Sequence, residues 1–393
     1  MNKTLWIISE LFYPNESATA YILTEIAMAL LTEYDVKVIC ADTNYEHDAS
    51  RVSAEDNQTL PGIEITRVSV PELDKNNIAK RLLRFITVSR RLYNVAKKMV
   101  KPGDVVFAVT NPAFILTYMV KLKRQKNIEY ILLVHDVFPE NAAATGVMKI
   151  QALYHRLKKR FDKAYSAADK IIVLGEDMKQ IIADKIERDD NIYVCENWGS
   201  DEIIPRERES DGKIVLQYAG NIGRVQGIEK LVGLVTEISN DDLVFDFWGS
   251  GALVPYLNKF IETNHLENVR VRGSYSRGTQ QNQVLNDCDI AIVGLAKGMK
   301  GLGVPSKTYN ILAAGKPIIY IGDPGSEIYN LVKDNDLGAV FDWDHFDVLR
   351  NWLNGLTVSK LTDLREKGKQ ARALYEQRYT KEVILDKVLK VIK

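Results

Sequence analysis

Short apolar runs alternate along the chain with longer segments in which apolar residues recur every three or four positions. The short runs predict buried strands, and the longer segments predict helices that cover them. The first half contains seven such runs: Leu5–Ser9, Val36–Cys40, Ile63–Val68, Val105–Val109, Tyr130–Val134, Ile171–Leu174 and Ile192–Val194. The second half contains six: Ile214–Tyr218, Val244–Trp248, Val269–Arg272, Ile290–Val293, Ile318–Ile321 and Ala339–Phe341. This alternation predicts an α/β protein with two parallel sheets.

The segment 197–208, NWGSDEIIPRER, interrupts the alternation with glycine, proline and charge. We interpret it as an interdomain linker, since 393 residues exceed one typical core. The expected domains are 1–198 and 199–374, and a final helix, 375–393, returns to the first domain. A break near Tyr379-Thr380 is expected in the helical segment 361–393, and the polar segment 47–59 is expected to be a mobile loop.

Composition and charge limit the class of protein. Lys+Arg and Asp+Glu each total 52, so the balance gives no reason to expect nucleic-acid binding. The three cysteines show no CxxC spacing, which fits a reduced cytoplasmic protein, and the apolar run that ends at Glu10 is too short for a signal peptide. Two basic segments, Asn77–Lys101 and Lys149–Lys163, are typical of contact with an anionic membrane surface. A solvated helix face on an α/β domain explains them equally well.

Glycine-rich turns follow several strands of the second half. GNIGRVQG contains Gly220 and Gly223, and Gly249 lies in a second such turn after the next strand. The carboxyl ends of parallel strands meet at one edge of a sheet, where open α/β sheets bind ligands. The positive charges of Arg224 and Lys307 beside these turns predict a phosphate-bearing ligand.

The stretch LGVPSKTYNILAAGKP adds a helix start to this edge. We expect Ser306 to be the N-cap residue, with its hydroxyl accepting a backbone N–H of the first helical turn. Lys307 then lies near free N–H groups, an arrangement that favours a bound anion. A second helix is expected to start at Ser326.

In the first half, the sequence HDVFPE follows the strand Tyr130–Val134. His135, Asp136 and Glu140 are therefore expected at the ligand edge of the first sheet. Capping and ion pairing explain any one of them, whereas three titratable groups in one strand-end loop indicate a functional site.

The motifs GNIGRVQG, GSG and PSKTYNILAAGKP resemble those of the family-4 retaining glycosyltransferases of the GT-B fold. HDVFPE, the NWG linker and GNIGxxQG are similar to a bacterial branch that builds surface polysaccharides, of the N-acetylfucosamine and colanic-acid type. The resemblance implies two Rossmann-like domains that face each other across a cleft. It also implies a nucleotide-sugar donor, retention of anomeric configuration, and no metal or other cofactor.

The resemblance also assigns roles to residues. The leaving diphosphate is stabilised by Arg224 and Lys307, and the acceptor hydroxyl is oriented or deprotonated by His135, Asp136 and Glu140. The implied donor-binding residues are Gly220, Asn221, Gly223, Gln226, Gly249, Pro305, Ser306, Asn310, Ser326 and Glu327. Ser17 and Thr19 belong to an acceptor-side loop.

This sequence departs from the family pattern. Asn221 and Gln226 replace a usual Arg and Lys, and Leu302 and Asn310 occupy the places of two usual glutamates. Glu327 serves either donor hydroxyls or its own helix N-terminus.

The implied activity is transfer of a sugar from a nucleotide donor, UDP being the expected nucleotide, to a polyprenyl-diphosphate-linked saccharide. Capsule, O-antigen or exopolysaccharide biosynthesis is the expected setting, at the inner face of the cytoplasmic membrane. Three alternatives stay open: an isomerase similar to UDP-N-acetylglucosamine 2-epimerase, a non-catalytic nucleotide-sugar binder, and a periplasmic-type binding protein.

Overall fold

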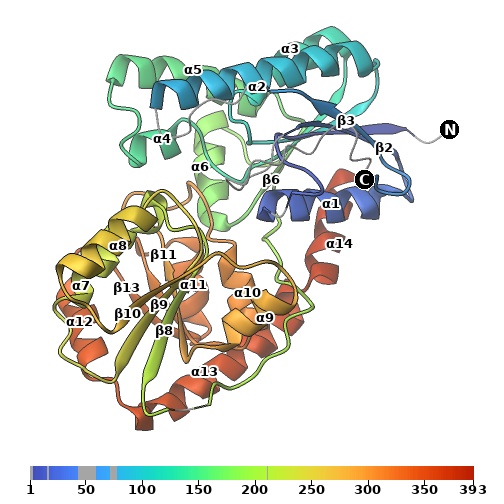
Figure 1. Ribbon diagram of the computed structural model, residues 1–393. Helices are drawn as coiled ribbons and strands as arrows, with labels where there is room; N and C mark the ends of the chain where they lie inside the picture. The colour runs from blue at the N-terminus through green and yellow to red at the C-terminus, as the bar shows by residue number, and fades with distance from the viewer. Residues whose placement is uncertain (1–2, 16, 43–58, 71–77, 210) are drawn as a thin grey trace. The chain divides into compact units, whose positions relative to one another are not determined.

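The computed structural model describes residues 3–15, 17–42, 59–70, 78–209 and 211–393. The polar segment 47–59, apart from Thr59, and residue Asn77 lie outside these ranges. The chain divides into two compact units (Figure 1). The N-terminal unit comprises 1–196 with 385–393, and the C-terminal unit comprises 197–384.

The N-terminal unit contains one parallel sheet in the order β3-β2-β1-β4-β5-β6-β7. All seven expected strands are confirmed, with ends shifted by at most one residue. Central strand β4 is buried along its whole length, because helices cover both faces of a parallel sheet of this kind. The strands are β1 (Thr4–Ile8), β2 (Asp35–Ala41), β3 (Glu64–Val68), β4 (Val105–Val109), β5 (Glu129–Leu133), β6 (Lys170–Val173) and β7 (Ile192–Val194).

The helices of this unit connect successive strands. They are α1 (Ala18–Leu30), α2 (Ile78–Met99), α3 (Ile115–Lys126), α4 (Glu140–Ala144), α5 (Gln151–Ser166) and α6 (Glu176–Ile186). The end of α14 (Lys381–Ile392) also packs here, where Lys387 pairs with Glu196 at 2.9 Å and Lys393 pairs with Glu33 at 3.0 Å. The C-terminal helix is thereby fixed to the first sheet by charged contacts.

The C-terminal unit contains a six-stranded parallel sheet in the order β10-β9-β8-β11-β12-β13. All six expected strands are confirmed. They are β8 (Ile214–Ala219), β9 (Leu243–Trp248), β10 (Val269–Gly273), β11 (Ile290–Gly294), β12 (Ile318–Ile321) and β13 (Gly338–Phe341). One hydrophobic core beneath the sheet includes Tyr218, Phe245, Ile292 and Trp343.

Helices again fill the connections. They are α7 (Ile228–Val235), α8 (Val254–Thr263), α9 (Thr279–Asn286), α10 (Lys307–Ala313), α11 (Glu327–Asp334), α12 (Phe346–Asn354) and α13 (Leu361–Leu374), with short 3-10 turns at 224–226 and 358–360. A π-helical turn, Tyr375–Tyr379, and extended Thr380 separate α13 from α14, which confirms the expected break.

In each sheet the strand order reverses direction once, between β1 and β4 in the first and between β8 and β11 in the second. Loops that leave such a point in opposite directions open a crevice at the carboxyl ends of the strands, where doubly wound sheets bind ligands. The turns after β1, β4 and β8 are therefore the places to seek a site. Among the described residues, no helix is long and apolar enough to span a membrane.

Candidate active site

The turns after β8 and β9 pack backbone against backbone. The N–H of Gly220 donates to the carbonyl of Trp248 at 2.8 Å, and that of Gly249 donates to the carbonyl of Gly273 at 2.7 Å. Gly249 has a φ of +135°, and a Cβ built on it would clash with the carbonyl oxygen of Gly220. Only glycine fits this position. The glycines of the two turns thus shape the carboxyl edge of the sheet.

Lys307 lies directly over this glycine turn. Its ammonium nitrogen is 3.2 Å from the centre of the Tyr218 ring, and a Cβ built on Gly220 would lie 3.2 Å from the same nitrogen. The nitrogen is buried and has no hydrogen-bond partner among the described residues. Desolvation holds the pKa of Lys307 well below its ordinary value of 10.5. A buried cation with only an aromatic face as neighbour is electrostatically incomplete, and an anion would complete it.

The remaining residues of the GNIGRVQG turn surround Gly223. A Cβ on Gly223 would lie 2.9 Å from Oε1 of Gln226 and 3.0 Å from Nδ2 of Asn221, so the two amide side chains meet there. The buried Oε1 of Gln226 has no hydrogen-bond partner in the described part of the chain. Arg224 begins the 3-10 turn with its side chain exposed. The turn therefore offers one exposed cation and an unused amide group.

Helices α10 and α11 start where the sequence predicts, directly after Ser306 and Ser326, but the expected capping hydrogen bond of Ser306 is absent. Ser306 is in the right-handed helical conformation (φ −60°, ψ −24°), and its hydroxyl makes no capping hydrogen bond, so the expected N-cap interaction is wrong. An N-cap side chain reaches the first turn from extended backbone, which Ser306 lacks. Ser326 is extended but also does not cap; its Oγ lies 2.9 Å from the hydroxyl of Tyr320. Glu327 and Pro305 are half-buried beside these starts.

Asn310 holds the segment that enters the C-terminal unit. Its Oδ1 accepts the backbone N–H of Ser200 at 2.9 Å, so this oxygen is already engaged. Asp323 follows β12, and its carboxylate accepts the N–H groups of Gly298 at 2.7 Å and Lys300 at 3.3 Å. It ties the loop after β11 to the loop after β12. The first of these loops leads to Lys307.

In the N-terminal unit, His135 is held from two sides. Nδ1 lies 3.2 Å from Oγ1 of Thr19, in the first turn of α1, and the backbone N–H donates to Oγ1 of Thr110 at 3.0 Å. Burial lowers the pKa of His135 to about 4, so the ring is neutral at pH 7. Its Nε2 is buried and has no partner among the described residues. Ser17 supports the arrangement, because its hydroxyl caps α1 by accepting the N–H of Ala20 at 3.3 Å.

Asp136 is the neighbour of this histidine. Burial raises its pKa to about 6, although Nδ2 of Asn141 donates to its Oδ1 at 2.9 Å. Thr110 also accepts the N–H of Asp136, at 3.2 Å. Thr110 follows β4 directly, and its position at the end of a buried strand is the only sequence signal that could have indicated it.

Glu140 is engaged elsewhere. Its Oε1 accepts from the buried ammonium of Lys185 at 2.6 Å, and Lys185 also pairs with Asp162 at 2.7 Å. This ion-pair cluster joins α4, α5 and α6. Glu140 therefore acts in the structure as a helix-packing residue, which is the ion-pairing alternative weighed from the sequence.

A buried ion pair at the end of β1 had no sequence signal. Arg84 of α2 and Glu10 lie 2.5 Å apart with side chains 11% and 5% exposed. Glu10 also exchanges backbone hydrogen bonds with Asn111 and Ala41, which follow β4 and end β2. The pair fixes α2 to the same sheet edge that carries His135. Among the described residues, no group of three or more His, Cys, Asp or Glu could hold a metal ion.

Comparison with known proteins agrees with this geometry. Residues 20–198 match the family model for Glycosyltransferase Family 4. A probable glycosyltransferase of Pseudomonas aeruginosa, WbjE, is 29% identical over 394 residues, which covers 98% of this chain and 96% of that protein. The motif-based resemblance is thereby confirmed.

Two solved structures extend the likeness of the fold to the whole chain. Anabaena HepE in complex with UDP and glucose gives a TM-score of 0.71 at 13% identity, covering 100% of this chain and 99% of that one. Sucrose-phosphate synthase from Thermosynechococcus elongatus gives 0.76 at 13% identity, covering 100% and 98%. The chain is thus a glycosyltransferase of the GT-B fold, and its residues 20–198 match the model of Glycosyltransferase Family 4.

Proposed function

We propose that the protein transfers a sugar from a UDP-sugar to a lipid-linked saccharide during the synthesis of a surface polysaccharide, with retention of configuration and without a metal ion. The observation that carries the proposal is the buried, uncompensated ammonium of Lys307 over the glycine turn. The diphosphate of a nucleotide sugar supplies the missing negative charge. HepE, which shares the fold, was crystallised with UDP, and this supports UDP as the nucleotide.

Lys307 and Arg224 act on the leaving group. Glycosyl transfer places new negative charge on the departing diphosphate, and fixed cations in a dry site stabilise that charge. The lowered pKa of Lys307 is restored once the diphosphate lies beside it, so the ammonium is charged when the bond breaks. Arg224, exposed in the free protein, provides a second positive charge from the same turn.

The acceptor-side groups have distinct roles. A histidine with a pKa near 4 is a weak base at neutral pH, so His135 orients the acceptor hydroxyl through its free Nε2. Asp136, with a pKa near 6, is better matched to accept a proton at neutral pH. Thr19 and Thr110 hold the two groups in place.

The lipid-linked acceptor requires contact with a membrane surface. Exposed apolar side chains lie on α2 (Leu82, Leu83 and Ile86) and at the start of α5 (Ile150 and Leu153). Exposed basic residues accompany them: Arg90, Arg91, Lys97 and Lys98 on α2, and Arg156, Lys159, Arg160 and Lys163 on α5. Both helices pack against α3 (Figure 1). The side chains of 78–81, including Lys80 and Arg81, lie outside the description. This surface combines apolar and cationic groups, as interfacial helices do.

Flotation with vesicles of phosphatidylglycerol tests the membrane contact. We expect the wild type to float and the double variant Leu83→Glu/Ile150→Glu to stay in the dense fraction. Val348→Glu/Val358→Glu introduces the same charge at two exposed apolar positions of the C-terminal unit and should float like the wild type. Equal flotation of all three proteins would contradict the proposed surface.

Calorimetric titration with UDP and GDP in metal-free buffer tests the donor site. We expect UDP to bind the wild type and the Lys333→Ala control, and binding to Lys307→Ala to weaken about tenfold or more, the size of one hydrogen bond to a charged group. Lys333 is an exposed lysine that also lies over a tyrosine ring, at 5.9 Å. A preference for GDP would replace the nucleotide in the proposal. UDP binding that is unaffected by Lys307→Ala would remove the proposed site.

A further inference from the structure

A cavity lies in the C-terminal unit, at the edge of the sheet opposite the glycine turns. Its volume is about 250 Å³, and it is lined where β11 and β12 begin, by residues such as Asp289 and Pro317. Of its 13 lining residues, six are basic and two are acidic. The basic residues are Arg206, Arg208, Lys316, Arg365, Lys369 and Arg372. This local surplus contrasts with the zero net charge of the whole chain.

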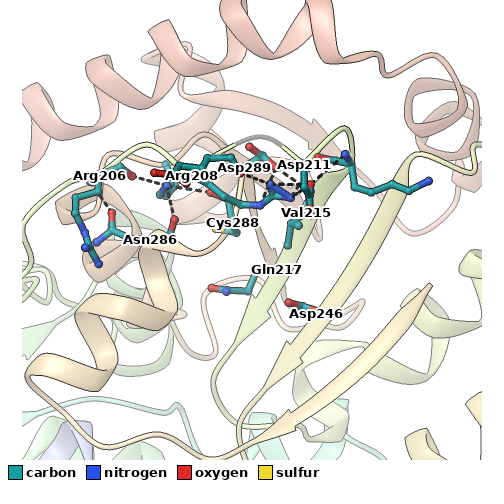
Figure 2. Close-up of polar contacts among 12 residues, drawn as sticks. Arg206, Arg208, Asp211, Val215, Gln217, Asp246, Asn286, Cys288 and Asp289 are labelled. Atoms are coloured by element: carbon teal, nitrogen blue, oxygen red, sulfur yellow. Dashed lines mark hydrogen bonds and ion pairs between the residues drawn. The ribbon is translucent and has the colours of Figure 1, made fainter. Parts of the chain in front are cut away.

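One basic residue of the lining, Arg208, is already paired with carboxylates. Arg208 lies 3.5 Å from Asp289 and 2.6 Å from Asp211, and Asp289 also accepts the N–H of Val215 at 2.9 Å (Figure 2). This cluster fixes the segment before β8 to the start of β11. It contains one cation and two carboxylates, so the cluster does not explain the positive surplus.

Lys316 is the most deeply buried of the six basic residues. It is 5% exposed, and its ammonium donates to the carbonyls of Arg206 at 2.8 Å, Asn286 at 3.0 Å and Cys288 at 3.0 Å. No carboxylate of the described residues lies within ion-pair distance of it, and burial lowers its pKa. Its hydrogen bonds are satisfied, whereas Asp289, Asp287 and Glu207 act on its charge only from beyond ion-pair distance. A bound anion would offset that charge.

The wall formed by α13 carries cations that can change partners. Arg365 lies 3.6 Å from Glu207, and Lys369 donates to Glu366 at 2.6 Å; the partner carboxylates are 63% and 61% exposed. Such solvent-exposed ion pairs contribute little to stability, so their side chains can readily turn to another partner. Arg372 is different, because it donates to the carbonyls of Ile203 and Ala313 and so serves the backbone. Arg365 and Lys369 are therefore the side chains available to a ligand.

We propose that this cavity binds a small soluble anion with one or two phosphoryl groups, at a site separate from the sugar-donor site. The size of the cavity sets the upper limit, since 250 Å³ corresponds to about eight water molecules at roughly 30 Å³ each, less than drug-sized ligands require. Arg365 and Lys369 donate to the phosphoryl oxygens, and Lys316 supplies buried positive charge beneath them. Arginine is suited to this role because its planar fork matches the geometry of phosphate.

Calorimetric titration with inorganic pyrophosphate at fixed ionic strength tests the proposal, in the Lys307→Ala background. That substitution weakens the proposed donor site about tenfold or more, so the tighter binding that remains reports the cavity. We expect binding to persist there and to weaken about tenfold or more when Arg365→Gln and Lys369→Gln are added, the loss expected for a hydrogen bond to a charged group. Both residues are on the surface of α13, and circular dichroism checks that the variants fold.

Lys259→Gln removes an exposed charge on α8, outside the lining, and should leave pyrophosphate binding unchanged. Failure of pyrophosphate to bind the Lys307→Ala protein would overturn the proposal, as would an equal loss with Lys259→Gln. Equal heats with sodium sulfate would also refute it, since they would show general attraction of anions. Each of these outcomes leaves the donor site unaffected, because that site is tested by UDP.

Discussion

Replacing Lys307 by methionine should make the protein more stable and less able to bind nucleotide. The ammonium is buried with no hydrogen-bond partner among the described residues, and it lies over the Tyr218 ring, 3.2 Å from the ring centre. Burying a charge costs several kcal/mol, and a desolvated cation–π contact returns about 2 kcal/mol. Methionine fills similar space without the charge. We expect the free energy of unfolding to rise by about 1–2 kcal/mol at pH 7.

The difference in stability between Lys307→Met and the wild type must depend on pH in a defined direction. The folded state holds the pKa of Lys307 below 10.5, so the unfolded chain binds more protons between the lowered value and 10.5. The wild type therefore gains stability as pH rises through that window, whereas Lys307→Met does not. The advantage of the variant should shrink towards pH 10. Thermal and urea unfolding at pH 7 and pH 9.5 measure this difference.

The matched control is Lys333→Met, which removes an exposed lysine from the last turn of α11. Its charge is solvated and favours the helix dipole, so we expect a loss of about 0.3–1 kcal/mol and unchanged UDP binding. A Lys307→Met protein that is less stable than the wild type at pH 7, or that binds UDP normally, would refute the account of Lys307 as an uncompensated cation held for a diphosphate.

Three further changes test other parts of the structure. Gly249→Ala should lower the free energy of unfolding by about 2–4 kcal/mol and abolish UDP binding, because the added Cβ has no room against Gly220. The control Gly233→Ala, at a helical position where the added Cβ would have no atom within 4 Å, should raise the free energy of unfolding by up to about 1 kcal/mol. Chemical denaturation compares the two variants. Asp136→Asn should raise the free energy of unfolding by about 2 kcal/mol at pH 7, because it removes the buried carboxylate. This advantage over the wild type should fall as pH drops through 6 and vanish below 3.8, since protonation of Asp136 removes the same cost. An advantage that does not change with pH would contradict the raised pKa. Glu10→Gln should lower the free energy of unfolding by about 3–5 kcal/mol, because it leaves Arg84 charged and buried. The double variant Glu10→Gln/Arg84→Met should recover much of this loss, and unfolding in urea measures both variants.

The strands were predictable from sequence because they are buried on both faces. A run such as VVFAV at β4 is apolar at every position, which no exposed segment tolerates, so strand ends were found to within one residue. The glycine turns were predictable for a similar reason. Gly249 has a φ of +135°, a backbone conformation that other residues rarely adopt, so a turn of this kind is marked in the sequence by its glycine.

Contacts between distant segments were not predictable. Glu10 and Arg84 are 74 positions apart and meet only because α2 crosses the end of β1. Likewise, Glu140 of α4 pairs with Lys185 of α6. The sequence indicated that Glu140 could form an ion pair, but it did not indicate which residue would be the partner. The capping role expected for Ser306 depended on backbone angles that the residue type does not determine.

The three cysteines make the chain convenient for site-specific labelling. Cys40, Cys195 and Cys288 are buried, and burial raises the pKa of the first two to about 11 and of the third to about 12. The reactive thiolate is therefore scarce at neutral pH, and maleimide dyes should leave the native cysteines unmodified. A cysteine introduced at exposed Lys98 and another at exposed Lys259 would carry a fluorophore pair on the two units. Energy transfer between the dyes would then report directly whether UDP changes the separation of the units in solution.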